Sequence, residues 1–203
     1  IRERRANEER LFRLAHLDPL TELPNRAVLR ERLTEIVTAM RAGPVLMFDL
    51  DGFKEINDRH GHATGDAALK AMAARLLACV RPIDTVSRLG GDEFVLIMPD
   101  IGDPLRAAAV AEAIITAVAE PFEHAGQTLR VGTSVGIALA PAHGENADDL
   151  LSCADLALYQ AKSEGRHCYR LFAPMLRERA QRTRTLRDEL GRAVENDEFV
   201  LFY

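Results

Sequence analysis

The sequence predicts an α+β domain in which antiparallel strand pairs pack against helices. Three observations lead to this class. An apolar run that ends in two acids, "PVLMFDLD", is typical of a strand buried on both faces. Two β-rich segments flank a glycine pair in "DTVSRLGGDEFVLIMP", which indicates a hairpin. Segments with helical periodicity separate the strands, so both kinds of element contribute to the core.

The first half of the chain is expected to alternate helix and strand. The charged opening "IRERRANEERLFRLAH" predicts a solvated helix that, if it has a partner, continues an upstream helix or pairs with a copy of itself. After the turn-like "DPLTELPNR", Asn25 is placed to cap a helix that runs to about Arg41. Beyond the buried strand, "GFKEIND" begins a helix or turn, and residues 67–80 repeat apolar residues at helical spacing.

The second half predicts a helix, a strand pair, a second helix and a short strand. A helix over residues 105–120 precedes the strand pair in "QTLRVGTSVGIALAP". Asn146 is placed to cap a helix over residues 147–165, and the strand "CYRLF" follows. From Ala173 onward, a charged helix leads into an apolar strand that looks like the opening of a second domain.

Composition excludes several classes of partner. The chain has 203 residues, 47% of them apolar, so it can bury a core, and its length suggests one domain with extra segments. A charged fraction of 28% and a net charge of −5 provide neither a basic surface for nucleic acid nor a polybasic lipid anchor. The longest nearly apolar stretch, residues 107–119, falls short of the roughly 20 residues that span a bilayer. We therefore expect no nucleic acid partner and no membrane segment in these residues.

The cysteines and the first residue bear on location. Cys79, Cys153 and Cys168 are an odd number without C-x-x-C spacing, which argues against a disulfide framework and a structural zinc site. A reducing, cytoplasmic compartment fits best. The chain begins with Ile1 and shows no signal-peptide pattern, so it is expected to be a piece of a longer polypeptide, with any membrane anchor upstream.

Two pairs of carboxylates are candidates for a metal site. Asp49 and Asp51 end the first strand, whose period of two puts both side chains on one face, and Asp92 and Glu93 lie at the hairpin. If the hairpin lies beside that strand, the crowded negative charge favours a bound cation, and all-oxygen ligation suits Mg²⁺ or Mn²⁺. The alternative is that D-x-D is a turn or helix start and "GGDE" an exposed hairpin tip.

Candidate phosphate-binding cations accompany these acids. Magnesium sites usually share their ion with substrate phosphates. Lys54 lies in "GFKEIND", a segment whose free N–H groups could hold phosphate oxygens. Lys162 and Arg166 are four residues apart, so both project from one face near a helix end. The alternative for that pair is simple compensation of the negative helix C-terminus.

Asn57 and Asp66 match the edge of a guanine base. A carboxylate can accept from the two neighbouring N–H donors on the guanine edge, and an amide can both donate and accept. Adenine lacks this pair of donors. The alternative is that Asp66 is a helix N-terminal acid and Asn57 a loop residue. His60 and His62 have no third nitrogen or sulfur ligand nearby in the sequence, and we interpret them as structural.

Four motifs in order resemble one known family. The segments "DPLTELPNR", "DLDGFKEINDRHGHATGD", "RLGGDEF" and "YQAKSEGRH" are similar to those of GGDEF domains, the diguanylate cyclases that condense two GTP into cyclic di-GMP and two pyrophosphates. The resemblance covers residues 18–172. It implies a mostly antiparallel central sheet surrounded by helices, like that of class III nucleotidyl cyclases and the polymerase palm.

The resemblance also implies a role for each matched residue. Asp49, Asp92 and Glu93, with the Leu50 carbonyl, are expected to bind Mg²⁺ or Mn²⁺. Asp92 or Glu93 is expected to assist deprotonation of the attacking 3′-hydroxyl. Asn57 and Asp66 are expected to read the guanine base. The triphosphate is expected to contact Lys54, Lys162, Arg166 and the backbone near Phe53. Gly90 and Gly91 are expected to let the backbone approach the α-phosphate. One departure is His167, where Asn commonly follows Arg.

Three more features follow from the resemblance. Because one domain holds one GTP, catalysis implies a homodimer. Arg81 and Asp84 form an R-x-x-D pattern five residues before the glycine pair, similar to the family's inhibitory site for cyclic di-GMP. The tail "LRDELGRAVENDEFVLFY" looks like the start of an EAL domain, a cyclic di-GMP phosphodiesterase, without its catalytic acids. The expected divisions are an N-terminal signalling helix over residues 1–17, a GGDEF domain over 18–172, and a linker helix with the first EAL strand over 173–203.

The resemblance leaves three functional hypotheses. An active diguanylate cyclase is favoured because the acids, base readers and phosphate cations are all present. A GTP-binding module that regulates an appended phosphodiesterase without turning over GTP is the alternative. A passive cyclic di-GMP receptor that uses only Arg81 and Asp84 would leave the GTP-site residues unexplained.

Overall fold

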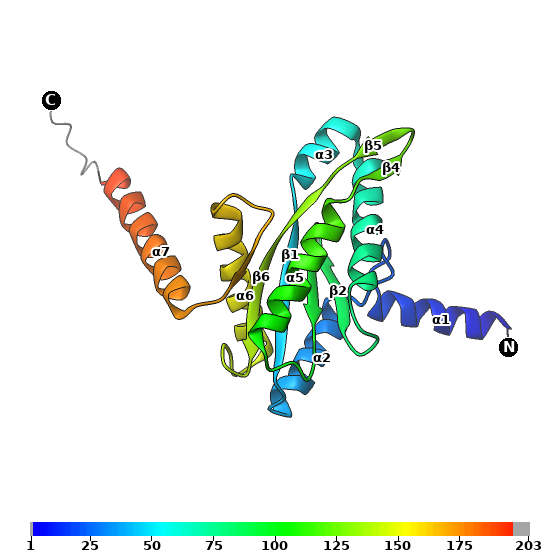
Figure 1. The fold of residues 1–203 in the computed structure, drawn as a ribbon, viewed down its shortest axis with the longest axis horizontal. Coiled ribbons are helices and arrows are strands. Elements are labelled where there is room, and N and C mark those ends of the chain that lie inside the picture. The colour runs from blue at the N-terminus through cyan, green and yellow to red at the C-terminus, as the bar shows by residue number, and fades with distance from the viewer. Residues whose placement is uncertain (1, 197–203) are drawn as a thin grey trace. The chain divides into compact units, whose positions relative to one another are not determined.

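The structure, a computed structural model, describes residues 2–196. The chain divides into two compact units, Ile1–Phe172 and Ala173–Tyr203. The first unit contains all of the strands in the described part of the chain (Figure 1). Up to residue 196, the second unit consists of one helix, α7, over Pro174–Glu195.

The first unit is built on a five-stranded sheet with the order β2-β3-β1-β6-β7. Central β1 pairs antiparallel with β3 and β6, β2 pairs antiparallel with β3, and β7 runs parallel to β6. The strands are Gly43–Asp51 (β1), Thr85–Gly90 (β2), Glu93–Ile97 (β3), Gly132–Ala140 (β6) and Tyr169–Leu171 (β7). The predicted class, a mostly antiparallel central sheet with surrounding helices, is confirmed.

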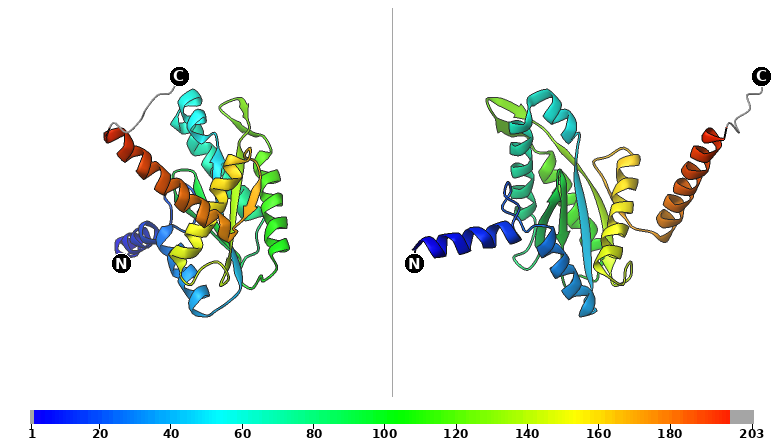
Figure 2. Two further views of the ribbon diagram at one scale, coloured as in Figure 1. Left: turned by 90° about the vertical axis from the view of Figure 1, so that its left-hand side faces the viewer. Right: turned by 180° about the vertical axis from the view of Figure 1, so that it is seen from behind.

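Helices cover both faces of this sheet (Figures 1 and 2). One face packs against α4 and α5, and the opposite face packs against α2 and α6. The helices of the unit are Arg2–His16 (α1), Arg26–Thr38 (α2), Phe53–His60 (α3), His62–Ala78 (α4), Pro104–Ala119 (α5) and Ala147–Ser163 (α6). Asn25 and Asn146 cap α2 and α6 through their side chains, as the sequence predicts.

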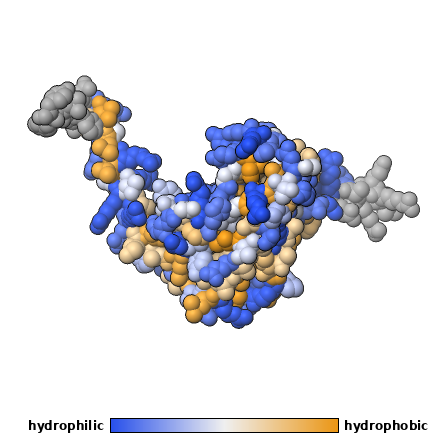
Figure 3. All heavy atoms as spheres, turned by 45° about the horizontal axis from the view of Figure 1, so that its top comes forward, coloured by the Kyte–Doolittle hydropathy of each residue, from blue (hydrophilic) through white to orange (hydrophobic). Residues whose placement is uncertain are grey.

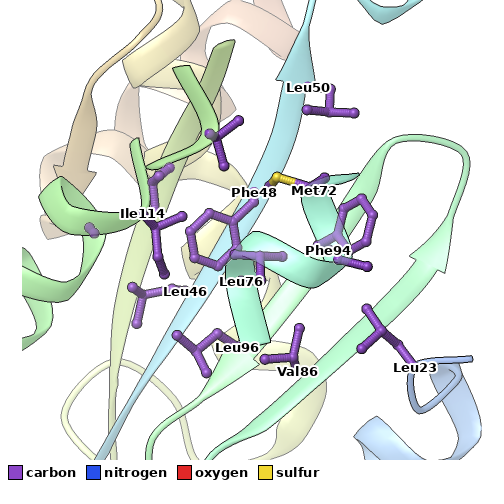
Figure 4. Close-up of a cluster of buried hydrophobic side chains, with 14 of the residues drawn as sticks. Leu23, Leu46, Phe48, Leu50, Met72, Leu76, Val86, Phe94, Leu96 and Ile114 are labelled. Carbon is purple, nitrogen blue, oxygen red and sulfur yellow. The ribbon is translucent and has the colours of Figure 1, made fainter. Parts of the chain in front are cut away.

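The core forms where the alternating residues of the strands meet the helices. Figure 4 shows one half of it, in which side chains from β1 and β3 lie against those of α4 and α5. Phe48 and Phe94 are fully buried there. Burial of large apolar side chains contributes roughly 1.5–3 kcal/mol each, so this cluster fixes β1 and β3 relative to each other. Both strands carry candidate site acids at their ends.

Two details of the predicted elements need correction. Helix α4 begins at His62 and not at residue 67. Residues 62–66, "HATGD", look like a loop turn in the sequence but belong to the start of this helix. The segment "QTLRVGTSVGIALAP" is not one strand pair. Its first part, β5 (Gln127–Leu129), pairs with an unpredicted strand, β4 (Phe122–His124), in a separate two-stranded sheet, while its second part is β6. The tail that resembles the start of an EAL domain extends into residues 197–203, which lie outside the described residues, so that expectation stays a prediction.

The visible surface is mostly hydrophilic. Figure 3 shows hydrophobic residues gathered in limited patches between polar ones. Across residues 2–196, no helix combines the length and the apolar character needed to cross a membrane. Cys79, Cys153 and Cys168 form no disulfide with one another.

Candidate functional site

The acids at the ends of β1 and β3 lie next to each other. In the antiparallel register, Asp49 of β1 is directly opposite Glu93 of β3. Directly opposed residues on such strands have their Cβ atoms about 4.5–5.5 Å apart. The hairpin therefore lies beside the first strand, which is the arrangement that the two carboxylate pairs required.

Asp49 is largely enclosed by its neighbours and paired with a cation. Its side chain is 13% exposed, and its Oδ2 lies 2.6 Å from Nζ of Lys162 on α6. Burial raises the pKa of Asp49; the Lys162 ammonium acts in the opposite direction, and the nearby Asp92 and Asp51 carboxylates add to the increase. Negative charge is thus concentrated at this end of the sheet.

These residues fit a hard divalent cation. The donors are all oxygen, which suits such a cation, and the cation would compete with the Lys162 ammonium for Asp49. Among residues 2–196, no three His, Cys, Asp or Glu side chains form a complete metal-binding group. A cation here would therefore also need oxygens from a backbone carbonyl, such as that of Leu50, and from substrate phosphates, which is how magnesium is usually held.

The glycine pair forms the open tip of the β2–β3 hairpin. Gly90 and Gly91 have φ angles of 144° and 54°, which side chains disfavour, and a Cβ at either position would meet no atom within 4 Å. The tip therefore leaves space for a ligand. It is held by Arg88, whose guanidinium donates to the Gly91 carbonyl at 2.7 and 3.0 Å and to Asp18 at 2.9 and 3.0 Å.

The predicted guanine readers lie on the neighbouring helices α3 and α4. Asn57 of α3 lies against Gly65 of α4, where an added Cβ would be 2.0 Å from the Asn57 Oδ1. Asp66 follows Gly65 and is exposed. The structure therefore brings these two readers close together. Lys54 is exposed in the first turn of α3, and Phe53 also lies close to Gly65.

Arg81 and Asp84 form a closed pair at a different place, before β2. The Arg81 guanidinium donates to the Asp84 carboxylate at 2.6 and 3.1 Å and to the Pro99 carbonyl at 3.0 Å. The Asp84 side chain is 1% exposed, whereas that of Arg81 is 43% exposed. Half of the arginine surface is therefore available to a ligand, while the carboxylate is covered.

Arg166 follows the end of α6, the helix that carries Lys162, and is exposed. The structure places both cations near the end of β1, because the backbone of the next residue, His167, bonds to Asp51. Sequence reasoning considered Asp51 only as a candidate metal-site carboxylate and assigned no contact to Ser134, His167 or Arg88. Their contacts join residues 70 to 116 positions apart, and a single sequence carries no signal for such pairings.

Comparison with known proteins identifies the relatives of this arrangement. The family described as "Diguanylate cyclase, GGDEF domain" matches residues 15–168. The bifunctional diguanylate cyclase/cyclic di-GMP phosphodiesterase MucR of Pseudomonas aeruginosa is 41% identical over 203 residues, covering 98% of the chain and 29% of MucR. The cyclic di-GMP phosphodiesterase PdeR of Escherichia coli is 34% identical over 205 residues, covering 100% of the chain and 31% of PdeR. The chain thus spans about a third of the length of these relatives.

A solved structure has the same architecture. The GGDEF domain of TpbB (YfiN) from Pseudomonas aeruginosa aligns with a TM-score of 0.79 and 38% identity. The alignment covers 82% of the chain and 99% of the TpbB domain. The likeness therefore extends over the whole of that domain.

Proposed function

The chain belongs to the GGDEF domain family, and from this premise we propose that it is a diguanylate cyclase that condenses two GTP into cyclic di-GMP and two pyrophosphates. One observation carries the proposal. Asp49 and Glu93 face each other across β1 and β3, and Lys162 lies against Asp49. Acids and a cation suited to binding phosphate thus lie together at one end of the central strands.

The proposed roles follow from the chemistry of the side chains. Asp49, Asp92 and Glu93, with the Leu50 carbonyl, would hold the divalent cation. When bound, Mg²⁺ or Mn²⁺ would neutralise charge on the transferring phosphoryl group and on the leaving pyrophosphate. Asp92 or Glu93 would accept the proton of the attacking 3′-hydroxyl. Phosphoryl transfer depends chiefly on positioning and charge neutralisation, and this set of residues is suited to both.

Substrate recognition is assigned to residues around this centre. Asn57 and Asp66 would read the guanine edge. Lys54, Lys162, Arg166 and the backbone at Phe53 would bind the triphosphate. Gly90 and Gly91 would let the hairpin backbone approach the α-phosphate, since a Cβ there would project into the open space. Because one domain would hold one GTP, ring closure requires two domains facing each other, and the active form is proposed to be a homodimer.

The test is product formation. Purified protein incubated with GTP and Mg²⁺ is expected to yield cyclic di-GMP, separated by chromatography, while ATP gives no corresponding dinucleotide. Asp92→Ala is expected to lower the rate by at least about a hundredfold, because it removes a carboxylate from the reacting centre. Absence of product from the wild type, together with identical behaviour of Asp92→Ala, would refute the proposal.

A second candidate function is supported by the similarity to PdeR, which is named a phosphodiesterase. In this reading the domain binds GTP and regulates a phosphodiesterase on the same polypeptide without turning GTP over. The phosphodiesterase rate of the longer protein, measured with and without GTP, separates the two. Activation by GTP without any cyclic di-GMP synthesis would favour regulation.

Arg81 and Asp84 are proposed to form an inhibitory site for the product. The half-exposed Arg81 could pair with a phosphate or stack on guanine. Because the buried Asp84 depends on Arg81, Arg81→Lys is the informative variant. Inhibition by cyclic di-GMP is expected to weaken at least about tenfold, with the uninhibited rate unchanged.

A further inference from the structure

Asp51 is an almost buried carboxylate to which the proposed reaction gives no role. Its side chain is 3% exposed at the end of β1. The Ser134 hydroxyl of β6 lies 2.8 and 3.0 Å from its two oxygens, and the His167 backbone N–H donates to Oδ2 at 3.2 Å. Burying a carboxylate is unfavourable unless donors satisfy it, so these contacts define where the side chain can lie.

The segment that reaches Asp51 is a sharp bend after α6, residues 165–167. Gly165, Arg166 and His167 all have positive φ angles, 118°, 63° and 51°. The Arg166 N–H bonds to the Ala161 carbonyl at 3.2 Å, as in a Schellman helix end, which accounts for the first part of the bend. Left-handed backbone is unfavourable for Arg and His, and it persists only where surrounding contacts hold it. The bond from His167 to Asp51 is such a contact.

Both cations that are proposed to bind the triphosphate, Lys162 and Arg166, lie next to this bend or within it. Lys162 lies in the last turn of α6, just before the bend, and contacts Asp49 at 2.6 Å. Arg166 lies within the bend. Asp49 and Asp51 project from the same face of β1, so two carboxylates of one strand hold the same segment of chain.

A glycine on β6 makes room for this arrangement. Gly132 is opposite Asp51 in the β1–β6 register, and a Cβ there would lie 1.7 Å from the Cε1 of the His167 imidazole. The His167 ring therefore lies directly on the Gly132 backbone. Its Nδ1 is 3.5 Å from the Asp51 carboxylate.

We infer that Asp51, supported by Ser134, is a positioning residue that fixes the 165–167 bend and thereby aims Arg166 and Lys162 at the triphosphate of GTP. The inference rests on the proposed function and extends it. A cation stabilises a phosphate well only if its side chain is held in place before the substrate arrives. Asp51 touches no reacting atom in this role.

The test compares two guanine nucleotides. In Asp51→Leu, which has nearly the same shape, both the Ser134 hydroxyl and the His167 N–H lose their acceptor. Calorimetry with Mg²⁺ would measure affinity for a GTP analogue with a methylene group between the α- and β-phosphates, and for GMP. We expect the analogue to bind about tenfold more weakly and GMP to bind as in the wild type, because only the outer phosphates lose their contacts. In cyclase assays, KM should rise more than kcat falls.

Glu145→Gln, which removes an exposed loop carboxylate, is the matched control and is expected to change neither affinity. Equal losses for both nucleotides, or no loss, would overturn the inference. So would a tenfold change in Mg²⁺ requirement with an unchanged nucleotide preference, because Asp51 would then act as a metal ligand. If the wild type binds the analogue but forms no product, the proposed function fails while the binding comparison still decides the role of Asp51.

A second variant covers the case in which Asp51→Leu does not fold. Gly132→Ala displaces the His167 ring without changing Asp51, and it is expected to weaken analogue binding by a similar factor. Adding His167→Ala removes the ring but keeps the backbone N–H, so the double variant should regain the wild-type preference. Wild-type preference in Gly132→Ala alone, or failure of the second change to restore it, would contradict the inference.

Discussion

Lys162 has two anionic partners in the proposed site. It contacts the Asp49 carboxylate at 2.6 Å, and it is proposed to bind the substrate triphosphate. A cation that binds at Asp49 must compete with this ammonium. We therefore predict opposite effects in Lys162→Gln. The variant should bind Mn²⁺ about threefold to tenfold more tightly in the absence of nucleotide, and its KM for GTP should rise about tenfold. Electron paramagnetic resonance of free Mn²⁺ and steady-state kinetics measure the two effects.

The control for this prediction is Lys70→Gln, which removes an exposed lysine of α4. It should leave both quantities unchanged. Weaker Mn²⁺ binding by Lys162→Gln would show that Lys162 does not compete for Asp49.

Gly65 determines how closely α4 approaches Asn57. An added Cβ would be 2.0 Å from the Asn57 Oδ1, so Gly65→Ala must move that amide. Loss of a hydrogen-bonded base reader removes discrimination against the wrong base. We predict that the preference for GTP over ATP falls about tenfold in Gly65→Ala and in Asn57→Ala, and that the double variant is no worse than either. If competition binding shows that the two losses of GTP preference add in the double variant, Gly65 does not act through Asn57.

The β2–β3 hairpin is the element whose position matters most, because its tip carries Asp92 and Glu93. Arg88 joins this tip to the loop after α1 by donating to Gly91 and to Asp18. The two charged side chains are only 10% and 15% exposed. Arg88→Met is therefore expected to lower the free energy of unfolding by about 2–4 kcal/mol, since it leaves Asp18 without its cation. Urea denaturation measures this, and a loss below 1 kcal/mol would contradict it.

Asp18 makes the same link dependent on pH. Burial raises the pKa of Asp18, but hydrogen bonds from Thr21 and Arg88 outweigh it, so the pKa lies below its ordinary value of 3.8. A carboxyl with a lowered folded pKa stabilises the fold above its unfolded pKa, and this contribution disappears as the pH falls through the folded pKa. The wild type should therefore exceed Asp18→Asn in stability at pH 6, and the difference should shrink below about pH 3.8. A constant difference from pH 6 to pH 3 in urea denaturation would contradict this.

Elements with strong local signals could be predicted from the sequence, and those that depend on distant partners could not. The continuous apolar run of β1 and the side-chain caps Asn25 and Asn146 were readable because their causes lie within a few residues. Strand β4 was missed because it has only three residues, Phe122–His124, and none of them is fully buried. The parallel pairing of β7 with β6 depends on the path of α6 between them.

For the molecule as a whole, the sequence predicted the chemistry of the proposed site but not the contacts that hold its residues together. The proposed acids, base readers and cations could be chosen from residue type and motif alone. The links from Asp51 to Ser134 and His167 span 83 and 116 positions, and that from Arg88 to Asp18 spans 70. Tertiary folding creates these contacts. The contacts of Asp51 join β1 to β6 and to the segment after α6, and those of Arg88 join the hairpin to the loop after α1.

The most direct measurement is a time course of both products from GTP and Mg²⁺ at several protein concentrations. If two GTP-loaded domains react with each other, the solution should gain two pyrophosphates for each cyclic di-GMP. Specific activity should also rise with protein concentration until the dimer forms, because a monomer cannot close the ring. Asp49→Asn should lower the rate by at least about a hundredfold while retaining the fold. Unchanged GTP with the wild type, or equal product formation by Asp49→Asn, would contradict the assignment of this chain as a diguanylate cyclase.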